Sequence, residues 1–365
     1  MPNQNLIEID GSYGSGGGQT LRSACALSAV TQKPCRIFNI RKSRPKPGLS
    51  IQHLLGIQAL AQFCNGRLEG DRLESEEIKF YPGDIYRDRV SVNIPTAGSI
   101  TLVLQTLILP ALFAPSPSQV LSNKIWEGKP LKIIFTGGAT DTFFSPTIDY
   151  FRYVFLPTLE KMNLTENRSP LVEISVLKRG YYPEGGAKVE IRVFPSKLKN
   201  LNLTERGSLK KILVISGASN ILKDKKVAER QIAGVREILG KLKLPIEEKI
   251  EYYQTQCPGS QICLIVEFEN TVIGTDNLGK LGKRAEDVGK EAALELLKEQ
   301  KSGACLDKHL GDQILIFMAL APGKNQVTVS EITNHCKTNI WVIEKFIEGK
   351  FKVKGSSISF LGKNF

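Results

Sequence analysis

Histidine is rare in this sequence of 365 residues, and its three copies are the first candidates for catalysis: His53, His309 and His335. His335 stands near the start of a predicted helix, directly after Thr333 and Asn334. The positive end of a helix dipole disfavours a protonated imidazole. A neutral ring nitrogen is the form that attacks phosphorus. The pattern favours His335 as a nucleophile, with a packing role as the alternative for each histidine.

A glycine-rich loop at residues 14–19 (GSGGGQ) follows an apolar strand and precedes a predicted helix. Its backbone N–H groups and the helix N-terminus could hold an anion. The loop matches neither the P-loop pattern nor the dinucleotide-binding pattern, so a tight turn that requires glycine angles is the alternative.

A basic run at residues 41–48 carries four cations in eight positions, including Arg41 and Arg44. Two prolines keep this run extended. Because guanidinium groups bind phosphate oxygens in a forked geometry, the run predicts contact with phosphates. A solvated basic loop is the alternative.

The composition favours a polyanionic partner, because the formal net charge is +12. The seven cysteines lack the spacing of a zinc site or a disulfide framework, and the N-terminal residues lack a signal-peptide pattern. We therefore expect a cytoplasmic protein. Its apolar stretches are too short to cross a membrane, so no membrane association is expected.

The elements that must position these residues recur three times. Segments starting at residues 14, 97 and 309 each lead into an apolar helix with a glutamine near its start. Second helical stretches follow at residues 49–64, 146–162 and 334–347. The class predicted is α+β, with α/β-type repeats: three copies of one strand-and-helix unit. Between the second and third copies, strands at 212–215 and 262–268 and a helix at 227–242 predict a small inserted domain.

Several motifs occur in an order that resembles the RNA 3′-terminal phosphate cyclases, from about residue 7 to residue 346. The most characteristic is RGYYPEGG at residues 179–186. The other matching stretches lie at residues 14–23, 44–49, 52–54, 98–112, 309–313, 333–335 and 338–339. The resemblance implies a three-repeat domain like the C-terminal domain of translation initiation factor three, with a thioredoxin-like insert. This agrees with the boundaries that the change in sequence character predicts, 1–186 and 281–365 for the repeats and 187–280 for the insert.

The resemblance also implies an activity: ATP-dependent conversion of an RNA 3′-phosphate to a 2′,3′-cyclic phosphate. A histidine would take AMP from ATP, pass it to the RNA 3′-phosphate, and the ribose 2′-OH would then expel AMP. His335 would be that histidine. Adenine-nucleotide contacts would come from Gln105, Pro146, His309, Leu310, Gly311, Asp312 and Gln313. Phosphates of ATP or RNA would be bound by Arg22, Arg41, Arg44, Gln52 and His53.

Three departures from the family pattern bear on the site. Ser15 stands where relatives can have a glutamate that would bind magnesium, so the ligands of the expected Mg²⁺ or other divalent metal are undetermined. Ile51 replaces an arginine, and Ala187 replaces the last glycine of the signature. The alternatives are a non-catalytic cyclase-like RNA-binding factor for ribosome assembly and an enolpyruvyl transferase, which shares the repeated architecture. The physiological RNA and the oligomeric state do not follow from the sequence.

Overall fold

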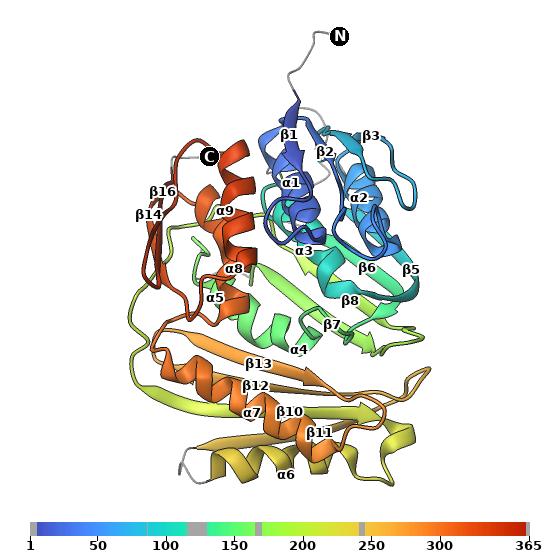
Figure 1. Cartoon of the computed structure of the whole chain (residues 1–365), viewed down its shortest axis with the longest axis vertical. Coiled ribbons are helices and arrows are strands. Elements are labelled where there is room, and N and C mark those ends of the chain that lie inside the picture. Colours follow the sequence, from blue (N-terminus) through green and yellow to red (C-terminus); the bar gives the residue numbers. More distant parts are fainter. Residues whose placement is uncertain (1–5, 86, 115–129, 165–169, 241–244, 363–365) are drawn as a thin grey trace.

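The computed structural model describes residues 6–85, 87–114, 130–164, 170–240 and 245–362, and the described strands form four sheets of four strands (Figure 1). In the first sheet the order is β1-β2-β4-β3. Its first pair is parallel and its other two pairs are antiparallel. The elements of this first unit are β1 (Ile7–Asp10), α1 (Gly18–Thr31), β2 (Cys35–Phe38), α2 (Ile51–Phe63), β3 (Arg67–Glu69) and β4 (Ile78–Tyr81).

The second unit repeats this topology in the order β5-β6-β8-β7. Its strands alternate buried and exposed residues, as expected when helices cover only one face of a sheet. The helical stretch predicted at 146–162 is divided into a short α-helix, a π-helical turn and another α-helix. The elements are β5 (Arg89–Ser99), α3 (Ile100–Leu112), β6 (Leu131–Ala139), α4 (Ile148–Tyr150), η2 (Phe151–Phe155), α5 (Leu156–Glu160), β7 (Val172–Lys178) and β8 (Lys188–Val193).

The third unit has the same pairing, in the order β9-β14-β16-β15. Three sheets therefore share one topology, which confirms the predicted α+β class and its three strand-and-helix units. The implied likeness to the initiation-factor domain stays a prediction. The elements of this unit are β9 (Asn202–Leu203), α8 (Lys308–Leu320), β14 (Gly323–Thr328), α9 (Asn334–Phe346), β15 (Lys352–Lys354) and β16 (Ser357–Gly362).

A fourth sheet is inserted between β9 and α8, at the bottom of Figure 1, in the order β11-β10-β12-β13. Its strand β12 is buried on both faces. Cys263 and Ile265 join the main core, while Ile262 and Leu264 join a second core beneath α6 and α7. The elements are β10 (Leu209–Ser219), η3 (Asn220–Leu222), α6 (Val227–Leu239), β11 (Ile246–Tyr253), β12 (Ser260–Phe268), β13 (Val272–Leu278) and α7 (Ala285–Lys301).

The pairing of strands bears on the expected domain boundaries. These boundaries stay a prediction, and so does the thioredoxin-like fold of the insert. Strand β8 pairs with β6 and β7 of the second unit, although its residues fall within the expected insert 187–280. Helix α7 packs against α6 and β13, although its residues lie beyond that range. The predicted helix 227–242 ends at Leu239 as α6, and residues 241–242 lie outside the described part of the chain.

Helices from different units pack against one another. Helix α1 of the first unit contacts α3 of the second and α9 of the third, and within the third unit α8 contacts α9. Their starts are fixed by local caps: the hydroxyl of Thr333 accepts from Cys336 N, and the carboxylate of Asp307 accepts from His309 N and Leu310 N. No helix in the described ranges has the length and apolarity required to span a bilayer.

Candidate active site

A cavity of about 440 Å³ lies where α1, α3, α8 and α9 meet. All three units contribute to it, and the inserted sheet adds one carboxylate, Asp276. Seven of the predicted site residues line this cavity, which brings the expected nucleophile and most of the expected nucleotide contacts together. The residues that line the cavity include Gln19, Arg22, Ser23, Gln105, Phe144, Ser145, Pro146, Tyr150, Asp276, His309, Asp312, Gln313, His335 and Asn339.

Three helix N-termini point their polar ends toward this cavity. Gln19, His309 and His335 each occupy the second position of their helix, in α1, α8 and α9 respectively. The unpaired N–H groups and the dipole at a helix start favour negative charge. The cavity is therefore suited to a polyanion such as a nucleotide phosphate chain.

His335 pairs through Nδ1 with Oε1 of Gln19, although the two residues are 316 positions apart in sequence. An amide oxygen is only an acceptor, so this contact requires the proton on Nδ1 and leaves the lone pair on Nε2. Partial desolvation of the ring lowers the pKa of His335, and the charges of Arg22, His309 and Arg44 lower it further. A lowered pKa favours the neutral form of the ring.

Arg22 supplies positive charge next to this histidine. Burial lowers the pKa of Arg22 to about 10, although the negative charge of Asp312 opposes that shift. Its Nε is buried without a hydrogen-bond partner among the described residues. Since an unsatisfied buried donor is costly, an anionic ligand would be stabilised here.

Asp312 is buried nearby, and burial raises its pKa to about 8 despite the opposing charge of Arg22. Its backbone oxygen accepts from Asn339 Nδ2 at 2.7 Å, and Asn339 Oδ1 accepts from Ser23 Oγ at 2.7 Å. These two hydrogen bonds join α8, α9 and α1. They hold Arg22, Asp312 and His335 in a common frame.

The predicted nucleotide contacts form one wall of the cavity. Gln105 Nε2 donates to Gln313 Oε1 at 3.3 Å. The carbonyl of Pro146 accepts from Thr101 Oγ1 at 2.8 Å, which ties the segment before α4 to α3. His309 is in the first turn of α8, and the capping carboxylate of that helix, Asp307, also accepts from the Tyr150 hydroxyl.

Two predicted nucleotide residues present no side chain to the cavity. Leu310 is fully buried in the core. Gly311 packs so closely on Val329 that an added Cβ would lie 2.3 Å from Val329 Cγ1.

The remaining predicted phosphate ligands lie outside the residues that line the cavity, and two of them, Arg44 and His53, lie beside the glycine loop. Arg44 Nη2 donates to Ser15 O at 3.4 Å, and Arg41 Nη1 donates to Gly48 O at 2.9 Å. His53 is buried against Gly18, where an added Cβ would lie 2.0 Å from His53 Nε2. Burial, with smaller effects of Arg22 and Arg41, lowers the pKa of His53 to about 3.

Gln52 accepts through Oε1 from Ser99 N at 3.0 Å and so connects α2 to the start of α3. The glycine loop itself is fixed by Ser15 N, which donates to Thr338 Oγ1 at 3.1 Å. Within the described ranges, no group of three or more His, Cys, Asp or Glu side chains is arranged to hold a metal ion.

Several lining residues were not among the predicted site residues. The sequence did contain a pattern that points to Gln19, because a glutamine recurs near the start of the corresponding helix in each of the three units. No sequence pattern points to Asp276, since it comes from strand β13 of the insert. Its Oδ2 accepts from Thr147 N at 2.7 Å. Phe144 is fully exposed with a φ of 63°, a left-handed conformation that local sequence does not indicate.

Comparisons with known proteins identify the family of this chain. The family model described as RNA 3′-terminal phosphate cyclase matches residues 13–353. The chain is 44% identical over 351 residues to the RNA 3′-terminal phosphate cyclase of Pyrococcus abyssi, covering 96% of each chain. It is 42% identical over 354 residues to that of Sulfolobus acidocaldarius, covering 96% of this chain and 98% of the relative. It is 41% identical over 353 residues to that of Archaeoglobus fulgidus, covering 97% and 99%. The chain therefore belongs to the RNA 3′-terminal phosphate cyclase family.

Proposed function

We propose that this protein is an ATP-dependent RNA 3′-terminal phosphate cyclase that works through an adenylate on His335. The observation that carries the proposal is the pairing of His335 Nδ1 with Gln19, at the cavity where the N-termini of α1, α8 and α9 meet. That pairing leaves Nε2 unprotonated beside a cavity suited to a triphosphate.

The reaction has three displacements at phosphorus. In the first, Nε2 of His335 attacks the α-phosphorus of ATP, and the bond to the β-phosphate oxygen breaks to release pyrophosphate. In the second, an oxygen of the RNA 3′-phosphate attacks the phosphorus of the adenylate, and the N–P bond breaks. In the third, the ribose 2′-OH attacks the activated RNA phosphorus, loses its proton to water and expels AMP. This last step is intramolecular, which raises the effective concentration of the nucleophile.

The residues of the cavity have distinct tasks in this scheme. Gln19 holds the reactive tautomer of His335. Arg22, with its unsatisfied Nε, binds a phosphate and stabilises charge that develops in the transition state. The adenosine lies against the wall built by Gln105, Pro146, His309, Asp312 and Gln313.

The RNA end enters beside the glycine loop. Arg41 and Arg44 are the cations of that region, and Arg44 already contacts the loop carbonyl of Ser15. Gln52 and His53 hold α2 against its neighbours. Their part is to keep this RNA-facing region in place.

A divalent ion, Mg²⁺ or another metal, accompanies the triphosphate in this proposal. Mg²⁺ commonly keeps several water ligands and binds mainly through substrate phosphates. This behaviour suits a cavity without a carboxylate in the glycine loop, where Ser15 stands. We also place the enzyme in the cytoplasm, which the seven free, buried cysteines support.

Labelling with α-³²P-ATP tests the nucleophile. The wild-type protein should acquire label that is labile to acid and stable to alkali, as expected of a phosphorus–nitrogen bond. His335→Ala should acquire none, whereas His309→Asn should still be labelled at raised ATP concentration.

A wild-type protein that takes no label with any divalent metal would support the non-catalytic RNA-binding alternative, for which Ser15 is the motivating departure. Turnover should require an oligonucleotide with a 3′-phosphate. Reaction with phosphoenolpyruvate in place of the oligonucleotide would support the enolpyruvyl transferase alternative.

A further inference from the structure

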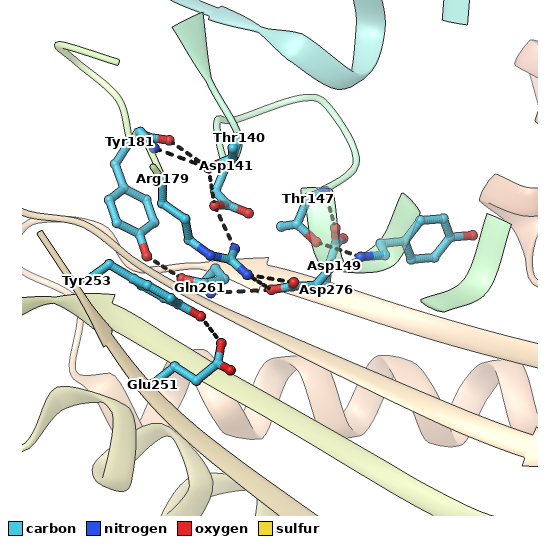
Figure 2. A network of polar contacts seen from close by, with 12 residues as sticks. Thr140, Asp141, Thr147, Asp149, Arg179, Tyr181, Glu251, Tyr253, Gln261 and Asp276 are labelled. Atoms are coloured by element: carbon cyan, nitrogen blue, oxygen red, sulfur yellow. Dashed lines mark hydrogen bonds and ion pairs between the residues drawn. The ribbon is translucent and has the colours of Figure 1, made fainter. Parts of the chain in front are cut away.

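The signature segment 179–186 has no part in the chemistry above, yet its first residue is buried at the junction of the second unit and the insert. Arg179 is 4% exposed. Its Nη1 donates to Asp141 Oδ2 at 3.0 Å, and its Nη2 donates to Asp149 Oδ1 and Oδ2 at 2.6 and 2.7 Å (Figure 2). One guanidinium thus bridges two buried carboxylates.

These two carboxylates stand at the two ends of the segment that forms part of the nucleotide wall. Asp141 follows β6 and Asp149 lies in α4. Between them are Phe144, Ser145 and Pro146, which line the cavity. Arg179 therefore fixes both ends of a cavity-lining segment without reaching the cavity itself.

Backbone hydrogen bonds complete the closure of this segment. Ile148 N donates to Thr140 O at 3.0 Å, which joins its ends. Thr140 N donates to Gly180 O at 3.0 Å, which attaches it to the signature segment. The geometry of the wall depends on the signature backbone as well as on Arg179.

Residues of the inserted sheet also contact Arg179, Asp149 and the 141–149 segment. The ring of Tyr253 in β11 lies 4.6 Å from the guanidinium carbon of Arg179. The side-chain amide of Gln261 in β12 lies between the Tyr181 hydroxyl, Arg179 Nη1 and Asp149 (Figure 2). Asp276 in β13 accepts from Thr147 N inside the segment itself.

We infer that Arg179 is a positioning residue for ATP, which locks the 141–149 segment in the shape of the nucleotide wall and links that shape to the inserted sheet. This inference rests on the proposed function, since it takes the cavity to be the ATP site. Without the fork of Arg179, two buried carboxylates would repel each other across the segment. Positions that bind a ligand must be held to within about 0.5 Å, so loosening the segment weakens ATP binding.

Two variants loosen the assembly in different ways. Arg179→Lys keeps the charge but loses the planar fork that serves both carboxylates. Tyr253→Leu removes the ring over the guanidinium and leaves the ion pairs intact. If Arg179→Lys does not fold, this variant alone tests whether loosening Arg179 weakens ATP binding.

Arg206→Lys is the matched control. Arg206 is also buried and also lies over an aromatic ring, that of Phe268. Its hydrogen bonds go to Gln300 O, Glu299 O and other groups at the end of α7, away from the 141–149 segment.

The measurement is the initial rate of His335 labelling as a function of ATP concentration, at a temperature where melting curves show every variant folded. Arg179→Lys should raise the half-saturating ATP concentration by about tenfold, and Tyr253→Leu should raise it several-fold, with little change in the rate at saturation. The double variant should be no worse than Arg179→Lys alone, because both act through one assembly. Arg206→Lys should keep the wild-type half-saturating concentration.

The inference is overturned if folded Arg179→Lys and Tyr253→Leu both saturate like the wild type, or if Arg206→Lys shifts saturation equally. Calorimetric titration of ATP into His335→Ala, with and without Arg179→Lys, separates this inference from the nucleophile. If the wild type takes no label but His335→Ala binds ATP more weakly when Arg179→Lys is added, His335 is not the nucleophile and the positioning role of Arg179 still holds. If His335→Ala and the His335→Ala, Arg179→Lys double variant bind ATP with equal affinity, or if neither binds ATP, the positioning role is overturned.

Discussion

The side chain of Gln19 contacts Nδ1 of His335 and thereby joins the first turn of α1 to the first turn of α9. The glutamine oxygen selects the tautomer whose Nε2 carries the lone pair. Gln19→Ala should therefore slow adenylate formation at saturating ATP by about 100-fold, since a histidine in the wrong tautomer is a poor nucleophile. Single-turnover labelling would measure this loss, and an unchanged rate would show that Gln19 does not set the tautomer.

The pH dependence of labelling should report the lowered pKa of His335. Only the neutral ring attacks, so the rate should rise as pH increases through a pKa below the ordinary value of about 6.5 and then remain level. Arg22 lowers that pKa. Replacing it in Arg22→Gln should move the rising limb to higher pH.

Arg44→Gln provides the comparison, because Arg44 contributes less than Arg22 to the lowered pKa of His335. Its rising limb should shift less. Equal positions of the limb in the wild type and Arg22→Gln would contradict the electrostatic explanation.

His53 should make the folded state sensitive to mild acid. Its folded-state pKa is about 3, because of burial, whereas the unfolded-state pKa is about 6.5. Below about pH 6.5 the unfolded chain binds a proton that the folded chain does not, so this residue reduces the free energy of unfolding by up to about 1.4 kcal/mol per pH unit until the pH approaches the folded-state pKa.

Urea unfolding at pH 7, 6 and 5 would measure this effect. His53→Gln should remove that part of the pH dependence, whatever its effect on stability at pH 7. Parallel pH profiles for the wild type and the variant would show that the ring is protonated in the folded protein.

An RNA whose terminal sugar lacks the 2′-OH should separate the second step from the third. Such an RNA with a 3′-phosphate should accept AMP and accumulate as the adenylate, because no internal nucleophile remains to expel AMP. Gel separation of the labelled RNA would identify the product. Efficient release of AMP from this substrate would contradict the mechanism.

Local sequence patterns predicted much of this molecule. Apolar spacing and repeated glutamines indicated three strand-and-helix units, because each unit must bury one face of its own helices. The position of His335 near a helix start was also readable, since Thr333 caps that helix through contacts within four residues. Family membership followed from ordered motifs along most of the chain.

Strand pairing and the composition of the cavity were decided at long range. Residues 188–193 are too few to show which sheet they join, and only their pairing with β6 and β7 places them in the second unit. Asp276 and Phe144 line the cavity because the insert and the 141–149 segment fold against it. Neither position carries a pattern that a single sequence reveals.

The amino-acid sequence by itself determined the repeated units, the helix starts and the nucleophile candidate, because these depend on propensity, capping and periodicity within a few residues. Tertiary structure alone decided which side chains meet. The contact of Gln19 with His335 and the clamp of Arg179 on Asp141 and Asp149 join segments that are 30 to 316 positions apart. Such contacts form only when separate sheets bury their faces against one another, and that packing has no signature in local spacing.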